Sequence, residues 1–146
     1  MYTIGQVSQM SGIPISTLRY YDREGLFPSL ARVGGIRQFS ENDLDALRII
    51  ECLKQSGLEI RDIRQFMAWC SMGSSTYELR LQLFLKQRAA VEAEISRLKK
   101  TLDMIRFKCW YYTQALRDGN EDRVQSMLPD GLPDEIQELY DHGRNR

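Results

Sequence analysis

The sequence feature that most constrains the fold is a stretch of 40 residues in which apolar side chains recur at alternating spacings of four and three, without glycine or proline. A 3.5-residue period predicts one continuous helix with a single apolar stripe. At 1.5 Å per residue this helix would extend about 60 Å, and one short chain cannot cover such a stripe by itself. We therefore expect a coiled coil with a second copy of the chain. The stripe, in which Arg88 is the one charged residue, comprises Tyr77, Leu81, Phe84, Arg88, Val91, Ile95, Leu98, Leu102, Ile105, Cys109, Tyr112 and Leu116.

The composition suits a soluble globular protein with one domain or two small ones. The chain has 146 residues, of which 42% are hydrophobic and 27% charged, and the net charge is zero. It contains no apolar run near the length of a membrane span and no signal-peptide pattern at its start, so we expect a cytoplasmic protein with no membrane partner. Phosphate binding needs clustered basic residues rather than an excess over the chain, so the neutral charge excludes no nucleic-acid partner.

The chain lacks the residue patterns of a metal site, a cofactor site or a catalytic centre. Cys52, Cys70 and Cys109 are widely spaced and odd in number, which favours free thiols, and no CxxC pair suggests zinc. The single histidine, His142, is accompanied by no GxSxG motif or P-loop. A cysteine hydrolase that pairs His142 with Cys52 or Cys109 is the remaining enzyme interpretation, and nothing in the sequence orients such a pair. We expect no enzyme, metal or cofactor.

Residues 1–70 predict a compact module of four helices and a small wing. Thr3 is placed to cap a first helix that ends at Gly12, and a second begins at Ser16 as its capping residue and ends at Gly25. Two short helices around a glycine-containing turn are typical of a helix-turn-helix. Pro28 and a Gly-Gly pair indicate a two-stranded wing or a loop over 26–39. Helices from 41, capped by Ser40, and from 59 to 70 complete the module.

The chain is expected to divide into three parts. The first is the winged helix-turn-helix domain over 1–70, and a Gly- and Ser-containing loop near 71–75 separates it from the coiled-coil dimerisation helix over 75–119. The third part, 120–146, is an acidic tail in which residues 133–141 predict one short helix. The fold class is therefore all-α, a mostly helical chain with one small wing.

Three motifs give the first module a family resemblance. They are Thr3-Ile4-Gly5-Gln6-Val7, Leu18-Arg19-Tyr20-Tyr21-Asp22-Arg23-Glu24-Gly25-Leu26 and Gly35-Ile36-Arg37-Gln38-Phe39. They resemble the DNA-binding domain of the MerR family of bacterial transcription regulators. The resemblance covers residues 1–70 in detail and extends as architecture to about residue 118. It implies a homodimer, joined by an antiparallel coiled coil, that binds a palindromic promoter operator in double-stranded DNA.

The physical interpretation of the module agrees with a DNA-binding role. A helix that begins near Ser16 presents free backbone amides and small hydroxyls to phosphate, and basic residues can lie along its exposed side. The alternative is that these charges only solvate the surface and that Arg37 is a salt-bridge partner within an ordinary hairpin. The expected DNA contacts are Ser16, Thr17, Arg19, Tyr20 and Arg23 on the second helix, with Arg32 and Arg37 in the wing.

The resemblance also implies an activation mechanism. MerR regulators bend and untwist a promoter whose two polymerase-binding elements are too far apart, so that RNA polymerase engages both. Cys52, which stands before Gly57-Leu58, resembles the cysteine of the thiol-sensing AdhR and NmlR branch, which responds to aldehydes and related electrophiles in stress. Arg48 and Lys54 would favour the reactive thiolate, whereas Glu51 opposes it. Alternatively Cys52 only packs in the third helix, as we expect of Cys70 and Cys109.

In an antiparallel dimer the aromatic cluster near the end of the long helix would lie beside the partner's DNA-binding module. This cluster is a candidate junction for a reversibly bound small ligand, a second interpretation within the same family. A third, from another class, is a structural coiled-coil protein whose helix-turn-helix contacts no DNA. The candidate junction residues are Phe107, Trp110, Tyr111 and Tyr112.

Overall fold

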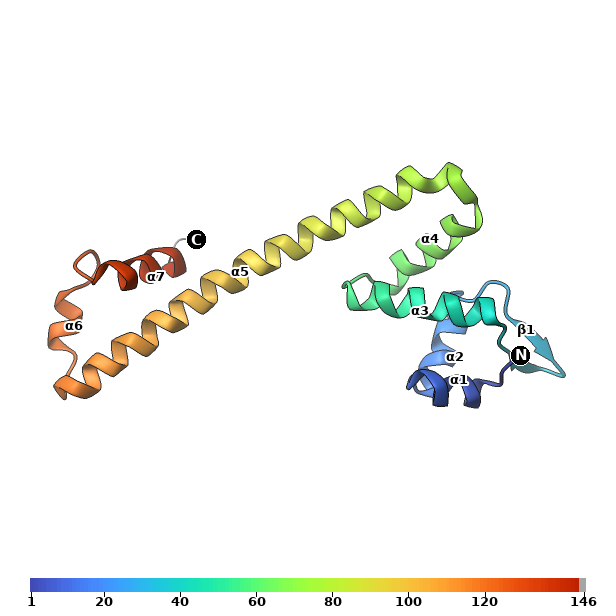
Figure 1. Ribbon diagram of the computed structural model, residues 1–146, viewed down its shortest axis with the longest axis horizontal. Helices are drawn as coiled ribbons and strands as arrows, with labels where there is room; N and C mark the ends of the chain where they lie inside the picture. Colours follow the sequence, from blue (N-terminus) through green and yellow to red (C-terminus); the bar gives the residue numbers. More distant parts are fainter. Residues whose placement is uncertain (145–146) are drawn as a thin grey trace. The chain divides into compact units, whose positions relative to one another are not determined.

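A computed structural model describes residues 1–144 and confirms a mostly helical chain with one small wing and one long helix (Figure 1). The chain forms two compact units, the first over Met1–Gln87 and the second from Arg88 onward. In chain order the elements are α1 (Ile4–Ser11), α2 (Ile15–Arg23), β1 (Ala31–Val33), β2 (Ile36–Gln38), α3 (Glu41–Gln55), α4 (Ile60–Ser71), a 3₁₀ turn η1 (Gly73–Thr76), α5 (Tyr77–Asp118), α6 (Asp122–Ser126) and α7 (Asp134–Arg144).

Local capping residues set the ends of α1 and the start of α3. The Thr3 hydroxyl accepts a hydrogen bond from the Gln6 amide, and the Gln6 side chain accepts one from the Thr3 amide. Ser40 and Asp43 make the same reciprocal pair before α3. These capping boxes satisfy backbone amides that lack partners within the helix. Gly12 ends α1 in the left-handed conformation that glycine adopts most readily.

The second helix begins two residues earlier than the sequence predicts. We expected Ser16 to be the capping residue, but α2 starts at Ile15 and its N-cap is Pro14, which makes no side-chain capping bond. Proline fits this place because its fixed φ suits a helix start and its missing N–H would have no partner there. The prediction for Ser16 is therefore wrong in detail, and Ser16 lies inside the first turn.

The first unit encloses one hydrophobic core, to which all four short helices contribute. Its fully buried side chains include Val7, Leu18, Tyr21, Phe39 and Ile50. Phe39 also extends the wing, because its backbone pairs with that of Tyr2 through two hydrogen bonds of 2.8 Å. This pairing ties the start of the chain to the end of β2. The core thus fixes α2 and the wing on one scaffold.

The apolar stripe of α5 is exposed in the single chain. In the second unit its large side chains from Val91 to Leu116 are between 42% and 84% exposed, and α5 ends before Gly119, as the sequence predicts. Exposed apolar surface of this extent is unusual on a folded chain and marks a candidate interaction surface. The exposed members in this unit are Val91, Ile95, Leu98, Leu102, Ile105, Tyr112 and Leu116.

The C-terminal residues form more structure than the single short helix that we expected. Both α6 and α7 are present, and Figure 1 shows α7 running back alongside the last part of α5. Val124 and Leu132 are buried against Phe107 and Tyr111, which makes a second hydrophobic core. Three of the four aromatic residues of the expected ligand junction, Phe107, Trp110 and Tyr111, therefore pack in the core with the chain's own C-terminal segment, whereas Tyr112 remains exposed. The acidic composition of this segment hid its apolar face.

Candidate nucleic-acid interface

The exposed side of α2 carries the basic residues that the sequence predicts for DNA contact. Leu18 and Tyr21 are buried in the core, which turns Arg19, Tyr20 and Arg23 toward solvent. Thr17 is half-buried and Ser16 exposed in the first turn of the helix. Because Pro14 supplies no side-chain cap, the first amides of α2 remain available to an anion.

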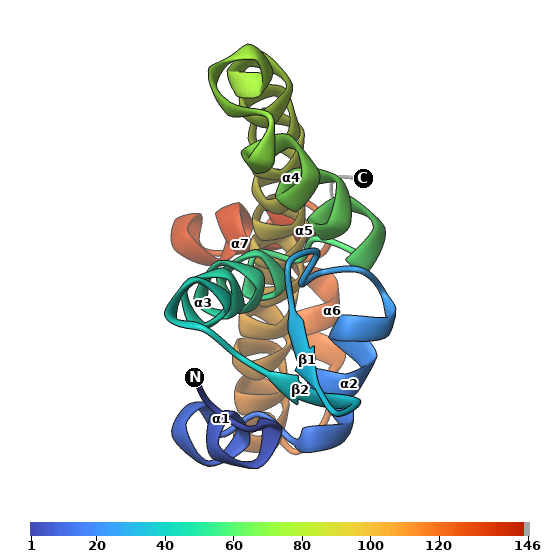
Figure 2. The ribbon, with the colours of Figure 1, turned by 90° about the vertical axis from the view of Figure 1, so that its right-hand side faces the viewer.

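The wing is a hairpin whose turn requires two glycines. Gly34 and Gly35 have φ values of 58° and 80°, and such a two-residue turn with positive φ matches the twist of the flanking strands. The strands pair Arg32 directly with Arg37, so both arginines lie on the same face of the hairpin. Figure 2 shows β1 and β2 beside α2.

Asp22 joins the wing to α2 and was missed by the sequence analysis. One of its oxygens, Oδ2, accepts hydrogen bonds from Arg37 Nε at 2.7 Å and from an Arg32 guanidinium nitrogen at 3.0 Å. Asp22 and Arg37 are only 13% and 19% exposed, whereas Arg32 is 51% exposed. The salt-bridge alternative for Arg37 is therefore present in the structure. An acidic residue between Arg19 and Arg23 was the available signal for a partner of the wing arginines.

Two further contacts hold α2 in place. The Tyr21 hydroxyl donates to Glu51 of α3 at 2.7 Å, and the Lys54 ammonium lies over the Tyr21 ring, 5.2 Å from its centroid. Burial raises the pKa of Tyr21, which keeps the phenol protonated as a donor. At the other end of α2, Arg64 of α4 donates to the Glu24 carbonyl oxygen at 2.6 Å and pairs with the Glu24 carboxylate. Helix α2 is thus tied to α3, α4 and the wing.

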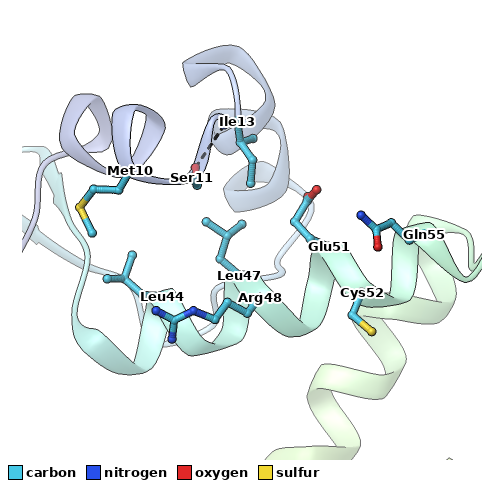
Figure 3. A pocket seen from close by; sticks show the side chains of 9 residues that line it. All are labelled: Met10, Ser11, Ile13, Leu44, Leu47, Arg48, Glu51, Cys52 and Gln55. Atoms are coloured by element: carbon cyan, nitrogen blue, oxygen red, sulfur yellow. Dashed lines mark hydrogen bonds between the residues drawn. The ribbon is translucent and has the colours of Figure 1, made fainter.

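Cys52 borders an open groove of about 490 Å³ between α1 and α3 (Figure 3). Its thiol is exposed, and Figure 3 shows the sulfur pointing away from the α1–α2 turn, toward which Leu47 and Glu51 point. The two cations that we expected to favour the Cys52 thiolate, Arg48 and Lys54, contact other residues. Arg48 pairs with Asp45 at 2.5 Å, and Lys54 lies over Tyr21. The groove is lined by Met10, Ser11, Ile13, Leu44, Leu47, Arg48, Glu51, Cys52 and Gln55.

The remaining candidate residues from the sequence are the other two cysteines and the single histidine. Cys70 is half-buried and Cys109 exposed. His142 contacts the Asp103 carboxylate. Residues 1–144 contain no group of three or more His, Cys, Asp or Glu side chains suited to a metal. Over the same residues no helix has the length and apolarity needed to cross a membrane.

Comparison with known proteins gives this geometry a family. A family model described as MerR HTH family regulatory protein matches residues 2–69. An uncharacterized HTH-type transcriptional regulator of Haemophilus influenzae is 38% identical, over 84% of this chain and 92% of its own length. The chain belongs to the MerR family. It is therefore a DNA-binding transcription regulator, and this family is not a class of enzymes.

Two named MerR proteins extend the comparison. AdhR of Bacillus subtilis is 34% identical over 58% of this chain and 61% of its own length. The crystal structure of HiNmlR, described as a MerR family regulator lacking the sensor domain and bound to promoter DNA, superposes with a TM-score of 0.64. HiNmlR is 36% identical, and the match covers 84% of this MerR chain and 98% of that one. The similarity to the AdhR and NmlR branch is thus confirmed.

Proposed function

We propose that this MerR regulator binds a palindromic promoter operator as a homodimer and activates transcription by bending and untwisting the DNA for RNA polymerase. The observation that carries the proposal is the exposed basic side of α2 with the wing fixed beside it through Asp22. A helix and a wing held on one scaffold can contact a major groove and the flanking phosphates together. The description of HiNmlR as bound to promoter DNA supports this assignment.

The contacts divide into base-reading and phosphate-binding groups. Arg19, Tyr20 and Arg23 project from the exposed side of α2, where they reach base edges and backbone in the major groove. Ser16 and Thr17 bind phosphate at the start of the helix, together with its uncapped amides. The wing contributes two further proposed DNA contacts, Arg32 and Arg37.

The two wing arginines have different parts in this proposal. Arg32 is half-exposed and can turn from Asp22 to a phosphate, because an exposed ion pair contributes little to stability. Arg37 is largely buried on Asp22, so its first role is to position the hairpin against α2. A phosphate near the wing would accept hydrogen bonds from the N–H groups of the Arg37 guanidinium that do not contact Asp22.

The dimer forms through the exposed stripe of α5, with the two helices antiparallel. The stripe keeps the 3.5-residue period over the whole helix, and pairing would remove its leucine and isoleucine side chains from water. A two-fold symmetric dimer presents two α2 helices to the two halves of a palindrome. The operator symmetry follows from the protein symmetry.

Electrophile modification of Cys52 is the proposed trigger. The thiolate would add to the carbonyl carbon of an aldehyde to give a hemithioacetal, and water would protonate the resulting alkoxide. The exposed thiol at the rim of the groove supports this step. The neighbouring residue, Glu51, holds Tyr21 of α2, so a change at Cys52 lies one residue from a contact to the recognition helix.

DNA binding is tested by fluorescence anisotropy of the full chain on its own upstream promoter fragment and on a scrambled fragment. Specific binding should be saturable at physiological salt, and log K should fall linearly with log salt. Energy transfer between dyes at the two ends of the fragment should report bending. Absence of a preference for the promoter would favour the structural coiled-coil alternative instead.

Cysteine sensing is tested by alkylation of the native protein at neutral pH with peptide mass mapping, using the unfolded chain as reference. Cys52 should react ahead of Cys109, which is also exposed in the single chain but lies on the α5 stripe that the proposed dimer covers. If both react alike and Cys52→Ser still responds in a promoter assay, covalent sensing fails. The second candidate function, a reversible ligand near Phe107, Trp110, Tyr111 and Tyr112, predicts that retained response.

A further inference from the structure

The second unit contains a hollow that the proposed DNA-binding and thiol chemistry do not use. It lies where α6 and α7 fold back on α5, and its volume is about 450 Å³. Small-molecule sites in proteins range from about 300 to 1,000 Å³. The hollow is therefore large enough for a ligand of one or two rings. The lining residues that carry the argument are Phe107, Lys108, Tyr111, Tyr112, Tyr140 and Arg144.

The wall of the hollow is a connected row of aromatic rings. The Phe107 ring centroid lies 4.9 Å from that of Tyr140 and 6.0 Å from that of Tyr111, and the Tyr111 and Tyr112 centroids are 5.0 Å apart. Phe107 and Tyr111 are buried in the core beneath the hollow, which fixes the positions of their rings. Such rings offer a preformed apolar surface for a flat ligand.

Two cations stand at the rim of this aromatic wall. The Lys108 ammonium lies 5.8 Å and 5.9 Å from the Phe107 and Tyr111 centroids, and the Arg144 guanidinium lies 4.8 Å from the Tyr140 centroid. Within residues 1–144 neither cation forms an ion pair with a carboxylate. The lining carboxylate, Glu121, already accepts a hydrogen bond of 2.8 Å from the Tyr111 hydroxyl. The unpaired charge at the rim is thus positive.

We propose that this hollow is a binding site for small aromatic carboxylates. The ring of the ligand packs on the exposed Tyr112 and half-buried Tyr140 rings of the wall, which Phe107 and Tyr111 support from beneath, and its carboxylate pairs with Lys108 and Arg144. A neutral analogue lacks the ion pairs, and a cationic analogue meets two like charges. The proposal deepens the second candidate function, on which it rests, by giving the reversible ligand a site and a chemical class, and it requires neither DNA nor the Cys52 thiol. Tyr112 belongs both to this site and to the exposed stripe of α5, so the ligand contacts the surface that we assign to dimerisation.

The test is isothermal titration calorimetry of the full chain with ligands that share a ring and differ in charge. Indole-3-acetate and phenylacetate are compared with indole-3-acetamide and tryptamine. We expect at least one of the two carboxylates to bind saturably at one site per chain, at least about tenfold more tightly than the neutral and cationic analogues, as loss of charged hydrogen bonds implies. No saturable binding of either acid below about 1 mM, or equal binding of the amide, overturns the proposal.

Matched variants locate the site. Lys108→Gln and Arg144→Gln should each weaken the bound carboxylate severalfold, whereas Lys99→Gln and Arg117→Gln, exposed residues of α5 outside the hollow, should leave its affinity unchanged. Equal effects of both pairs would mean that the acid binds elsewhere, which also overturns the proposal. Since the assay contains no DNA, its failure leaves the operator-binding proposal untouched, and the reverse also holds.

Discussion

The contact between Asp22 and the wing arginines gives a quantitative prediction about how α2 and the wing are held together. Asp22→Ala removes an acceptor from Arg37, whose side chain is mostly shielded from water. Hydrogen bonds to charged groups contribute about 1.5–3 kcal/mol. Because the Asp22–Arg37 pair keeps some exposure to water, we place its contribution to stability near the middle of this range, at about 2 kcal/mol. The half-exposed Arg32 pair adds less than about 1 kcal/mol. We therefore expect Asp22→Ala to lower the free energy of unfolding by about 2–3 kcal/mol.

Asp45→Ala is the matched control. Asp45 also sits in a helix and pairs with an arginine, Arg48, but the two side chains are 66% and 73% exposed. Both substitutions gain the same helix propensity, so the difference between them isolates the shielded ion pair. The control should cost less than about 0.5 kcal/mol, as exposed i,i+3 or i,i+4 pairs do.

The assay is urea unfolding of the full chain at one chain concentration, monitored by circular dichroism. A double-mutant cycle with Arg37→Ala should give a coupling energy of about 1.5–2 kcal/mol, because the two residues are in direct contact. If Asp22→Ala and Asp45→Ala lower stability equally, or the cycle gives no coupling, then Asp22 does not hold the wing and our account of the interface is wrong.

Three further predictions follow from other parts of the structure. Arg19→Ala should weaken promoter affinity at least tenfold and reduce the salt slope by about one in anisotropy titrations, whereas Arg117→Ala should change neither. Leu98→Glu places a charge on the exposed α5 stripe and should convert the dimer to monomers in sedimentation equilibrium. The control, Lys99→Glu, changes a neighbouring residue outside the stripe and should leave the dimer intact. A dimeric Leu98→Glu protein would mean that the stripe is not the interface. Gly143→Ala would place a Cβ 2.8 Å from the Met104 amide nitrogen, so α7 should shift from α5 and change the fluorescence of Trp110, which packs in the same core; an unchanged spectrum and stability would contradict that packing.

Much of the first unit could be predicted from short-range patterns. Thr3, Gly12 and Ser40 mark helix ends because capping bonds and left-handed turns involve residues only a few positions apart. The heptads gave the length of α5 for the same reason, since a helix repeats its environment every few residues. The exposed basic side of α2 followed from its buried Leu18 and Tyr21.

Only the tertiary structure decided which distant groups meet. Asp22 reaches Arg37 across 15 positions and Tyr21 reaches Glu51 across 30, and no periodicity records such pairs. The C-terminal segment likewise looked like an acidic tail, because Val124 and Leu132 are too widely spaced to form a pattern before α6 and α7 fold onto α5. The sequence by itself determined the helices of the first unit, the wing turn, the stripe and length of α5, and the family. The fold decided how the wing is held, where the aromatic rings are covered and which cations stand free, because these depend on contacts made only after the chain closes on itself.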